Sequence, residues 1–333
     1  ASLVPFAPPA AVRRCMRQAL ALQVYPDRSY SKLRQAIAQR HQVAADAVLP
    51  GTGAAELFTW AARDAAALEL NHLPAPGFAD YERALACWGG RWQREDLVLP
   101  HQEAGPQRLS TAFRSQLAGL QGPLWVTNPH NPTGQLWSRD SLLELLDRVP
   151  LLIVDEAFLP LVPDGEQQSL AALASRHPQL VVIRSLTKLF GIAGLRLGYA
   201  IAEPQRLQRW SVWRDPWPVN GLAAAAGEVL MADAAWTRRV QTWVATERPW
   251  LVGELVRRGW QVSPSSGNFL LVRRGHSLET WRQKLEQKHH ILVRDCRSFE
   301  GLDERWWRLA LLDRRRNRRL LRALDQVQAT DRA

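Results

Sequence analysis

Apolar runs alternate with helical patterns between about residues 47 and 202. Runs typical of buried strands occupy 66–73, 122–129, 151–158, 180–186 and 196–202. Helical spacing of apolar residues follows at 77–88 and 138–149, and a polar turn and a helix are expected after 158. Strands that are apolar at successive positions are buried on both faces. The alternation therefore predicts an α/β fold with three layers, in which helices flank a mostly parallel sheet.

The pattern changes after about residue 230. A long helical stretch rich in Trp and Arg comes first, at 235–258. Shorter strand-like and helical runs follow it, at 265–274, 277–288, 291–296 and 306–312. This predicts a smaller α+β domain behind the large one. We expect an N-terminal segment that packs with the small domain, a large domain and a small C-terminal domain, over residues 1–24, 25–230 and 231–333.

The composition is that of an ordinary globular protein, with 333 residues, 46% hydrophobic and 23% charged. Three cysteines without C-x-x-C spacing argue against a disulfide scaffold or a zinc finger and favour a reducing, cytoplasmic location. No run reaches the roughly 18 uncharged apolar residues of a membrane span. The first residues carry prolines and arginines where a signal peptide is apolar, so we predict no targeting segment.

The net charge of +11 changes the picture more, because a basic excess fits nucleic acid, an acidic membrane face or an anionic small substrate. The densest basic run covers 313–324, where Leu320, Leu321 and Leu324 recur at helical spacing. We interpret it as a C-terminal helix with a solvated basic face and expect no nucleic-acid partner. The 15 tryptophans are scattered, which favours core or subunit-interface positions.

Polar residues follow three of the predicted strands. The segment 128–134 closes one strand, Asp155 ends the next, and Ser185 to Lys188 follow a third. In parallel sheets ligands bind beyond the carboxyl ends of the strands. The sequence therefore predicts that an asparagine, an aspartate and a lysine meet at one edge of the sheet.

Each of these features also has a plain structural interpretation. A lysine in a loop is most often solvated, Asp155 could form a structural salt bridge, and glycines before a helix, as at 51–53, are common in turns. Against this, the hydroxyls of Ser185 and Thr187 are groups that donate to a phosphate. A partly desolvated Lys188 could form a Schiff base.

Five motifs together resemble a known family. They are G-x-G-A-x-E, N-P-x-N-P-T-G, D-E-A-F, S-x-T-K and G-L-R-x-G-Y, in this order, at 51–56, 128–134, 155–158, 185–188 and 194–199. The set resembles the fold-type I pyridoxal-phosphate enzymes of the class I/II aminotransferase family, and the resemblance covers nearly the whole chain. It implies pyridoxal 5'-phosphate as cofactor.

The resemblance also implies roles for single residues. Lys188 would hold the cofactor in a Schiff base and move protons, Asp155 would keep the pyridine nitrogen protonated, and Asn131 would bind the 3' oxygen. Phe78 would stack on the ring, with Tyr81 nearby. The backbone at two alanines and three side chains would hold the cofactor phosphate: Ala54, Ala55, Ser185, Thr187 and Arg196.

Substrate and partner follow from the same resemblance. Arg308 would pair with the α-carboxylate of a small anionic amino-acid substrate, beside Asn131. Tyr25 resembles the tyrosine that reaches the phosphate in the partner subunit, which implies a homodimer with shared active sites. No metal is implied.

Within the family the chain is most similar to the threonine-phosphate decarboxylases of cobalamin biosynthesis and to the histidinol-phosphate aminotransferases. Phe158 and the segments 216–220 and 291–302 favour the decarboxylases. The leading expectation is therefore a lyase that decarboxylates L-threonine O-3-phosphate. The alternatives are an aminotransferase acting on histidinol phosphate or another amino acid, and a non-enzymatic basic binding protein.

Overall fold

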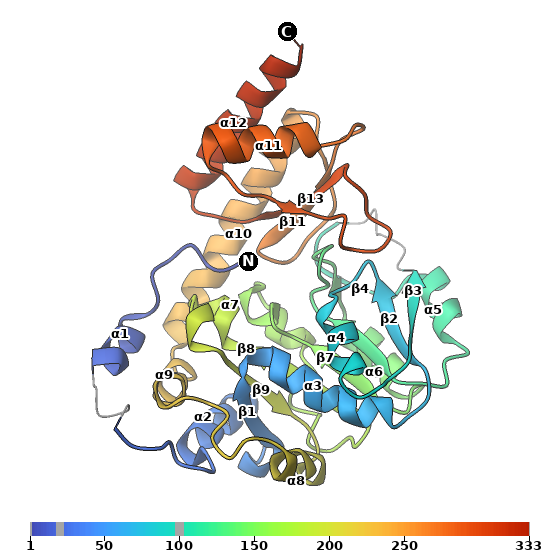
Figure 1. Ribbon diagram of the computed structural model, residues 1–333, viewed down its shortest axis with the longest axis vertical. Helices are drawn as coiled ribbons and strands as arrows, with labels where there is room; N and C mark the ends of the chain where they lie inside the picture. Colours follow the sequence, from blue (N-terminus) through green and yellow to red (C-terminus); the bar gives the residue numbers. More distant parts are fainter. Residues whose placement is uncertain (1, 18–22, 97–102, 333) are drawn as a thin grey trace.

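A seven-stranded sheet forms the centre of the molecule (Figure 1). The computed structural model describes residues 2–17, 23–96 and 103–332. The strand order is β1-β9-β8-β7-β5-β2-β3. The bounds are β1 (Val48–Thr52), β2 (Asn71–Ala75), β3 (Trp92–Asp96), β5 (Leu124–Thr127), β7 (Leu152–Asp155), β8 (Leu180–Ser185) and β9 (Leu197–Ile201).

The five strands β3, β2, β5, β7 and β8 run parallel, and β9 is antiparallel to both β8 and β1. The prediction of a mostly parallel sheet is confirmed. Every residue of β5, β7, β8 and β9 is buried, as expected for strands that are covered on both faces.

Helices cover both faces of this sheet and give the three predicted layers (Figure 1). Alternate residues of a strand point to opposite faces. Accordingly Val154 packs into one core, with α2 and α6, whereas Ile153 packs into the other, with α3 and α4. The helices are α1 (Ala10–Arg17), α2 (Ser31–His41), α3 (Gly53–Ala66), α4 (Asp80–Ala86), α5 (Thr111–Leu117), α6 (Arg139–Leu146), α7 (Leu186–Phe190), α8 (Pro204–Trp213) and α9 (Gly221–Leu230).

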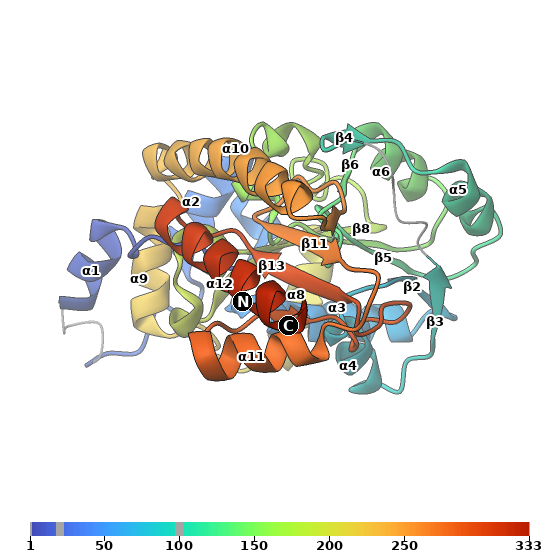
Figure 2. The same ribbon diagram turned by 90° about the horizontal axis from the view of Figure 1, so that it is seen from above.

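The C-terminal part forms a second unit around an antiparallel sheet of order β10-β11-β13-β12. Helix α12 packs between α10 and α11, and it ends at the far tip of the molecule (Figures 1 and 2). The bounds are α10 (Ala234–Arg257), β10 (Gln261–Val262), β11 (Phe269–Arg273), α11 (Glu279–His289), β12 (Arg294–Asp295), β13 (Trp306–Ala310) and α12 (Arg314–Arg332).

The N-terminal segment runs between the two units. The ring of Phe6 meets the rings of Trp236 and Trp243 on α10 edge-on, at 6.0 and 5.6 Å. Asn268, just before β11, donates to the carbonyl of Ser2 at 3.0 Å. The division of the chain at residues 24 and 230 stays a prediction, and residues 18–22 of the predicted N-terminal segment lie outside the described residues.

Two predicted elements are wrong. The run 66–73 is not one strand, because residue 66 ends α3 and β2 begins at Asn71. The helix expected after residue 158 is replaced by two short 3₁₀ turns, Leu159–Leu161 and Gly165–Gln168. Pro160 is tolerated at the start of the first turn, but Pro163 lacks the backbone donor that would extend it and Gly165 costs backbone entropy. A two-stranded sheet of β4 (Pro106–Gln107) and β6 (Leu136–Trp137) was not predicted.

None of the helices in the described part of the chain is long and apolar enough to cross a membrane.

Candidate functional site

A cavity of about 450 Å³ opens at the carboxyl ends of β7 and β8, where it lies between the large sheet and the C-terminal unit. The structure brings most of the predicted site residues together around it, from seven separate segments. They are Ala54, Ala55, Phe78, Asn131, Asp155, Ser185, Thr187, Lys188, Arg196 and Arg308.

Asp155 sits at the end of β7 and is buried. Its carboxylate accepts hydrogen bonds from the Ala157 amide at 2.9 Å and from the Tyr81 hydroxyl at 2.7 Å. Burial raises the pKa of Asp155 to about 6, although these two hydrogen bonds and the nearby Lys188 charge oppose the shift. A cationic ring nitrogen in the cavity would favour the ionised carboxylate, so the site is suited to hold one.

Lys188 lies in the short helix α7, which starts directly after β8 and ends where Gly191 adopts a positive φ of 65°. Burial lowers the pKa of its amine. The positive charges of Arg308 and Arg196 act in the same direction, while Asp155 opposes them. A lysine with a lowered pKa has more of the neutral, nucleophilic amine, which is what covalent attachment to an aldehyde requires.

The N-terminus of α3 faces the cavity through Ala54 and Ala55 and supplies backbone N–H groups and a positive partial charge. Gly53 has a positive φ of 73°, and a Cβ there would collide with the guanidinium of Arg196. The hydroxyls of Ser185 and Thr187 lie 2.7 Å apart on the other side. The backbone N–H groups of α3, the two hydroxyls and the Arg196 guanidinium together form a site that fits a phosphate.

Phe78 lies at the rim of the cavity and is 37% exposed. Its ring meets the Tyr81 ring edge-on at 5.6 Å and the Phe58 ring at 6.4 Å, so one edge is packed while the rest stays free for a planar ligand. Asn131 lies in the same cavity, in a turn with cis bonds before Pro129 and Pro132, and its side-chain oxygen accepts a hydrogen bond from Arg308.

Two arginines of the C-terminal unit lie side by side on neighbouring strands in the cavity wall. Arg294 and Arg308 are directly opposite in the pairing of β12 with β13, and both line the cavity. Burial, together with the charge of Arg294, lowers the pKa of Arg308. No ion pair to either arginine is found among the described residues. Like charges directly opposite each other destabilise a strand pair, so this arrangement calls for an anionic ligand.

Sequence reasoning missed Arg294, although the segment around it was noticed. The register that pairs it with Arg308 depends on two short strands that sequence patterns do not align. It also missed Ser298 and Phe299, whose loop forms part of the cavity wall. Arg294 donates to Ser298 Oγ at 2.6 Å and lies 5.5 Å from the centre of the Phe299 ring, which holds the guanidinium in place.

Two predicted site residues are not among the residues that line the cavity. Tyr81 lies behind it and contacts Asp155, so its hydroxyl acts on the carboxylate instead of on the ligand. Tyr25 is 77% exposed and stacks on Trp217 with ring centres 4.5 Å apart. The roles of all the predicted residues stay predictions at this point.

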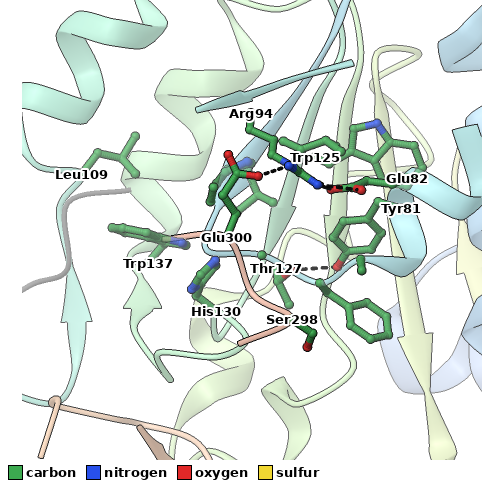
Figure 3. Close-up of a pocket in the computed structure, with 17 residues that line it drawn as sticks. Tyr81, Glu82, Arg94, Leu109, Trp125, Thr127, His130, Trp137, Ser298 and Glu300 are labelled. Carbon is green, nitrogen blue, oxygen red and sulfur yellow. Dashed lines mark hydrogen bonds and ion pairs between the residues drawn. The ribbon is translucent and has the colours of Figure 1, made fainter. Parts of the chain in front are cut away.

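A smaller cavity of about 120 Å³ adjoins the first one (Figure 3). Arg94 lies at its mouth between Glu82 and Glu300, and this ion-paired group joins the large sheet to the C-terminal unit. Inside, burial lowers the pKa of His130 to about 3, and its Nδ1 bonds to the Thr133 hydroxyl at 2.9 Å. We interpret this histidine as structural and neutral.

No group of three or more His, Cys, Asp or Glu side chains that could hold a metal ion exists within residues 2–17, 23–96 and 103–332.

Comparison with known proteins decides the family. The sequence model for "Aminotransferase class I and II" matches residues 4–324, which is nearly the whole chain. The chain belongs to this family. The membership confirms the resemblance on which the cofactor and the enzyme class were predicted, and members of this family are pyridoxal-phosphate enzymes.

Two curated relatives are similar over most of their length. The threonine-phosphate decarboxylase of Salmonella typhimurium is 36% identical, covering 98% of this chain and 90% of the relative. A histidinol-phosphate aminotransferase of Symbiobacterium thermophilum is 32% identical, covering 95% and 84%. Among solved structures, the histidinol-phosphate aminotransferase of Clostridium acetobutylicum superimposes with a TM-score of 0.88 at 25% identity, covering 99% and 98%.

Proposed function

We propose that this enzyme decarboxylates L-threonine O-3-phosphate with pyridoxal 5'-phosphate as cofactor, as a step of cobalamin biosynthesis in the cytoplasm. The observation that carries the proposal is the 36% identity to a threonine-phosphate decarboxylase over 98% of the chain. The paired arginines support it, because the substrate carries two anionic groups, a carboxylate and a phosphate.

The residues around the cavity fit the cofactor. The cradle of Ala54, Ala55, Ser185, Thr187 and Arg196 would take its phosphate. Asp155 would bind its pyridine nitrogen, Asn131 its 3' oxygen and Lys188 its aldehyde carbon, with Phe78 against the ring. When bound, the cofactor draws electrons from a bond at the Cα of the substrate amine.

Residues of the protein would then determine which bond at the substrate Cα breaks. The orientation in which the substrate carboxylate is held would decide between decarboxylation and proton removal at Cα. Arg308, whose guanidinium donates to Asn131, would bind and orient that carboxylate. Lys188 lines the same cavity, and its ammonium would give a proton to Cα once carbon dioxide has left. The product is an aminopropanol phosphate.

The test is incubation of the purified, cofactor-loaded enzyme with L-threonine O-3-phosphate while carbon dioxide and the amine product are measured. One mole of carbon dioxide per mole of substrate supports the proposal. Transfer of the amino group to 2-oxoglutarate without carbon dioxide would instead establish the second candidate, an aminotransferase. That candidate is favoured by the 32% identity to a histidinol-phosphate aminotransferase over 95% of the chain.

We also propose a homodimer with shared sites. The exposed ring of Tyr25, stacked on Trp217, gives the chain an aromatic surface that a second subunit would cover. In such a dimer Tyr25 would reach the cofactor phosphate of the partner subunit. Mixing Lys188→Ala chains with Tyr25→Ala chains tests this, because only hybrid dimers with shared sites regain one intact site. Activity that never exceeds the sum of the separate variants contradicts it.

A further inference from the structure

A groove of about 350 Å³ lies on the C-terminal unit, outside the cofactor cavity. It exists because β12 pairs with β13 over two residues, and the chain before β12, at 290–293, runs apart from β13. The first turns of α12 form the opposite wall. Ser2, Arg294 and Arg308 line both hollows, so they form a common wall between the groove and the cavity.

The groove is basic. Two arginines of α12, Arg316 and Arg319, line its outer end at helical i, i+3 spacing, and Arg294 and Arg308 line its inner end. No acidic side chain is among the described residues that line it. The net charge of +11 adds a long-range attraction for anions to this local one.

The outer arginines are only weakly engaged within the described part of the chain. Arg316 forms an ion pair with Asp313 at 3.4 Å, in which both side chains are well exposed, and such pairs contribute little. It also reaches the Pro5 carbonyl at 3.5 Å. Arg319 donates to the His289 carbonyl at 2.6 Å and forms no ion pair with a carboxylate within residues 2–17, 23–96 and 103–332. Both guanidinium groups can therefore turn to an anion.

The floor and one wall are apolar. Leu309, Leu312 and Leu320 line the groove, and Leu292 stands at its side with 84% of its surface exposed. Exposed leucine beside arginine is typical of a site for a ligand that has both an apolar and an anionic part.

We propose that this groove is a second anion site, which binds a small phosphomonoester through Arg316 and Arg319, with the carbon chain of the ligand against the leucines. The site is separate from the cofactor cavity but shares its arginine wall. It does not depend on the proposed reaction, since it is argued from the charge and shape of the groove alone.

The experiment is isothermal titration calorimetry of the cofactor-loaded enzyme with n-butyl phosphate and, in a second arm, with inorganic phosphate. The test variant is Arg316→Gln/Arg319→Gln. The matched control is Arg315→Gln/Arg318→Gln, which removes the same two charges from exposed positions of α12 that do not line the groove. Thermal unfolding of both variants verifies that they fold.

We expect the wild type and the control to bind one more n-butyl phosphate per chain than the test variant does. The loss at that site should be tenfold or more in affinity, about the strength of one charge-assisted hydrogen bond. Inorganic phosphate should bind the site more weakly, because it cannot use the leucines. Equal stoichiometry and affinity in all three proteins overturn the proposal, and so does an equal loss in both variants. No turnover is needed, so failure of the decarboxylase proposal is seen separately.

Discussion

The two walls of the cofactor cavity are built differently. On the large-sheet side the polar groups are buried and held by neighbours: Asp155 is 5% exposed and accepts two hydrogen bonds. On the C-terminal side Arg294 is exposed, and Arg308 donates to Asn131 but forms no ion pair with any described residue. The polar groups on the large-sheet side are therefore held in place before any ligand binds. Those on the C-terminal side carry positive charge that no described carboxylate neutralises.

The difference separates cofactor chemistry from substrate chemistry. A fixed wall with a raised carboxylate pKa and a lowered lysine pKa suits a cofactor that stays in place. A wall whose two arginines have no carboxylate partner among the described residues suits an anionic substrate that enters and leaves with each turnover. Changes in the first wall should therefore abolish chemistry, whereas changes in the second should weaken substrate binding.

The largest effect is expected from Lys188→Ala. It removes the amine that, as proposed, would attach the cofactor and move the proton at Cα, so we expect kcat to fall by about 10⁴-fold or more, at the upper end for loss of a proton-transfer group. The visible absorbance of the purified protein, which borohydride should bleach in the wild type, should disappear. Lys288→Ala, an exposed lysine of α11, is the control and should behave like the wild type. A coloured, active Lys188→Ala enzyme would remove this lysine from the mechanism.

Asp155→Asn should come next. The amide keeps the shape of the side chain but removes the charge that would lie opposite the pyridine nitrogen, so we expect kcat to fall about 10²- to 10³-fold. Steady-state kinetics at saturating cofactor measure this. A loss confined to cofactor affinity, with normal kcat, would show that Asp155 binds the cofactor without tuning it.

The same variant tests the pH dependence of the protein without cofactor. Because the pKa of Asp155 is raised from 3.8 to about 6, the folded protein binds this proton more tightly than the unfolded chain does. Its contribution is fully present below pH 4 and is lost as the pH rises through 6, by roughly 3 kcal/mol. Urea unfolding of both proteins from pH 4 to 7 should show the decline in the wild type relative to Asp155→Asn. Parallel curves would contradict it.

Arg308→Gln should mainly weaken the binding of the substrate. Losing a bidentate contact to a carboxylate should lower kcat/KM by about 10- to 100-fold, and Arg308→Lys should recover part of this, since lysine keeps the charge without the planar fork. Arg305→Gln, at a half-buried position just before β13 that does not line the cavity, is the control. If Arg308→Gln lowers kcat as strongly as Asp155→Asn, the proposed division between the two walls fails.

The smallest effect is expected from Glu300→Gln, which breaks the contact with Arg94 between the two units (Figure 3). Both side chains are nearly half exposed, so the free energy of unfolding should fall by no more than about 1 kcal/mol, and less in high salt. Urea unfolding at low and high ionic strength measures it. A larger, salt-independent loss would mean that this contact holds the C-terminal unit in place.

The fold was largely predictable because continuous apolar strands such as β7 and β8 carry their own signal. The helix expected after Phe158 was wrong, because Pro163 and Gly165 limit this segment to 3₁₀ turns and their effect was not taken into account. Tyr81 shows the same limit within the site. The sequence places it near Phe78, and only the packed structure turns its hydroxyl to Asp155.

The sequence by itself determined the family and the cofactor. Both are indicated by short motifs, and each motif places several functional groups close together within a few residues. Ser185 to Lys188 is one such segment, and the turn at 128–134 is another. Only the tertiary structure decided that Arg294 lies opposite Arg308 and that both separate the cavity from a basic groove. The strand register and the position of α12 beside the small sheet depend on contacts between distant parts of the chain. Local sequence patterns do not predict such contacts.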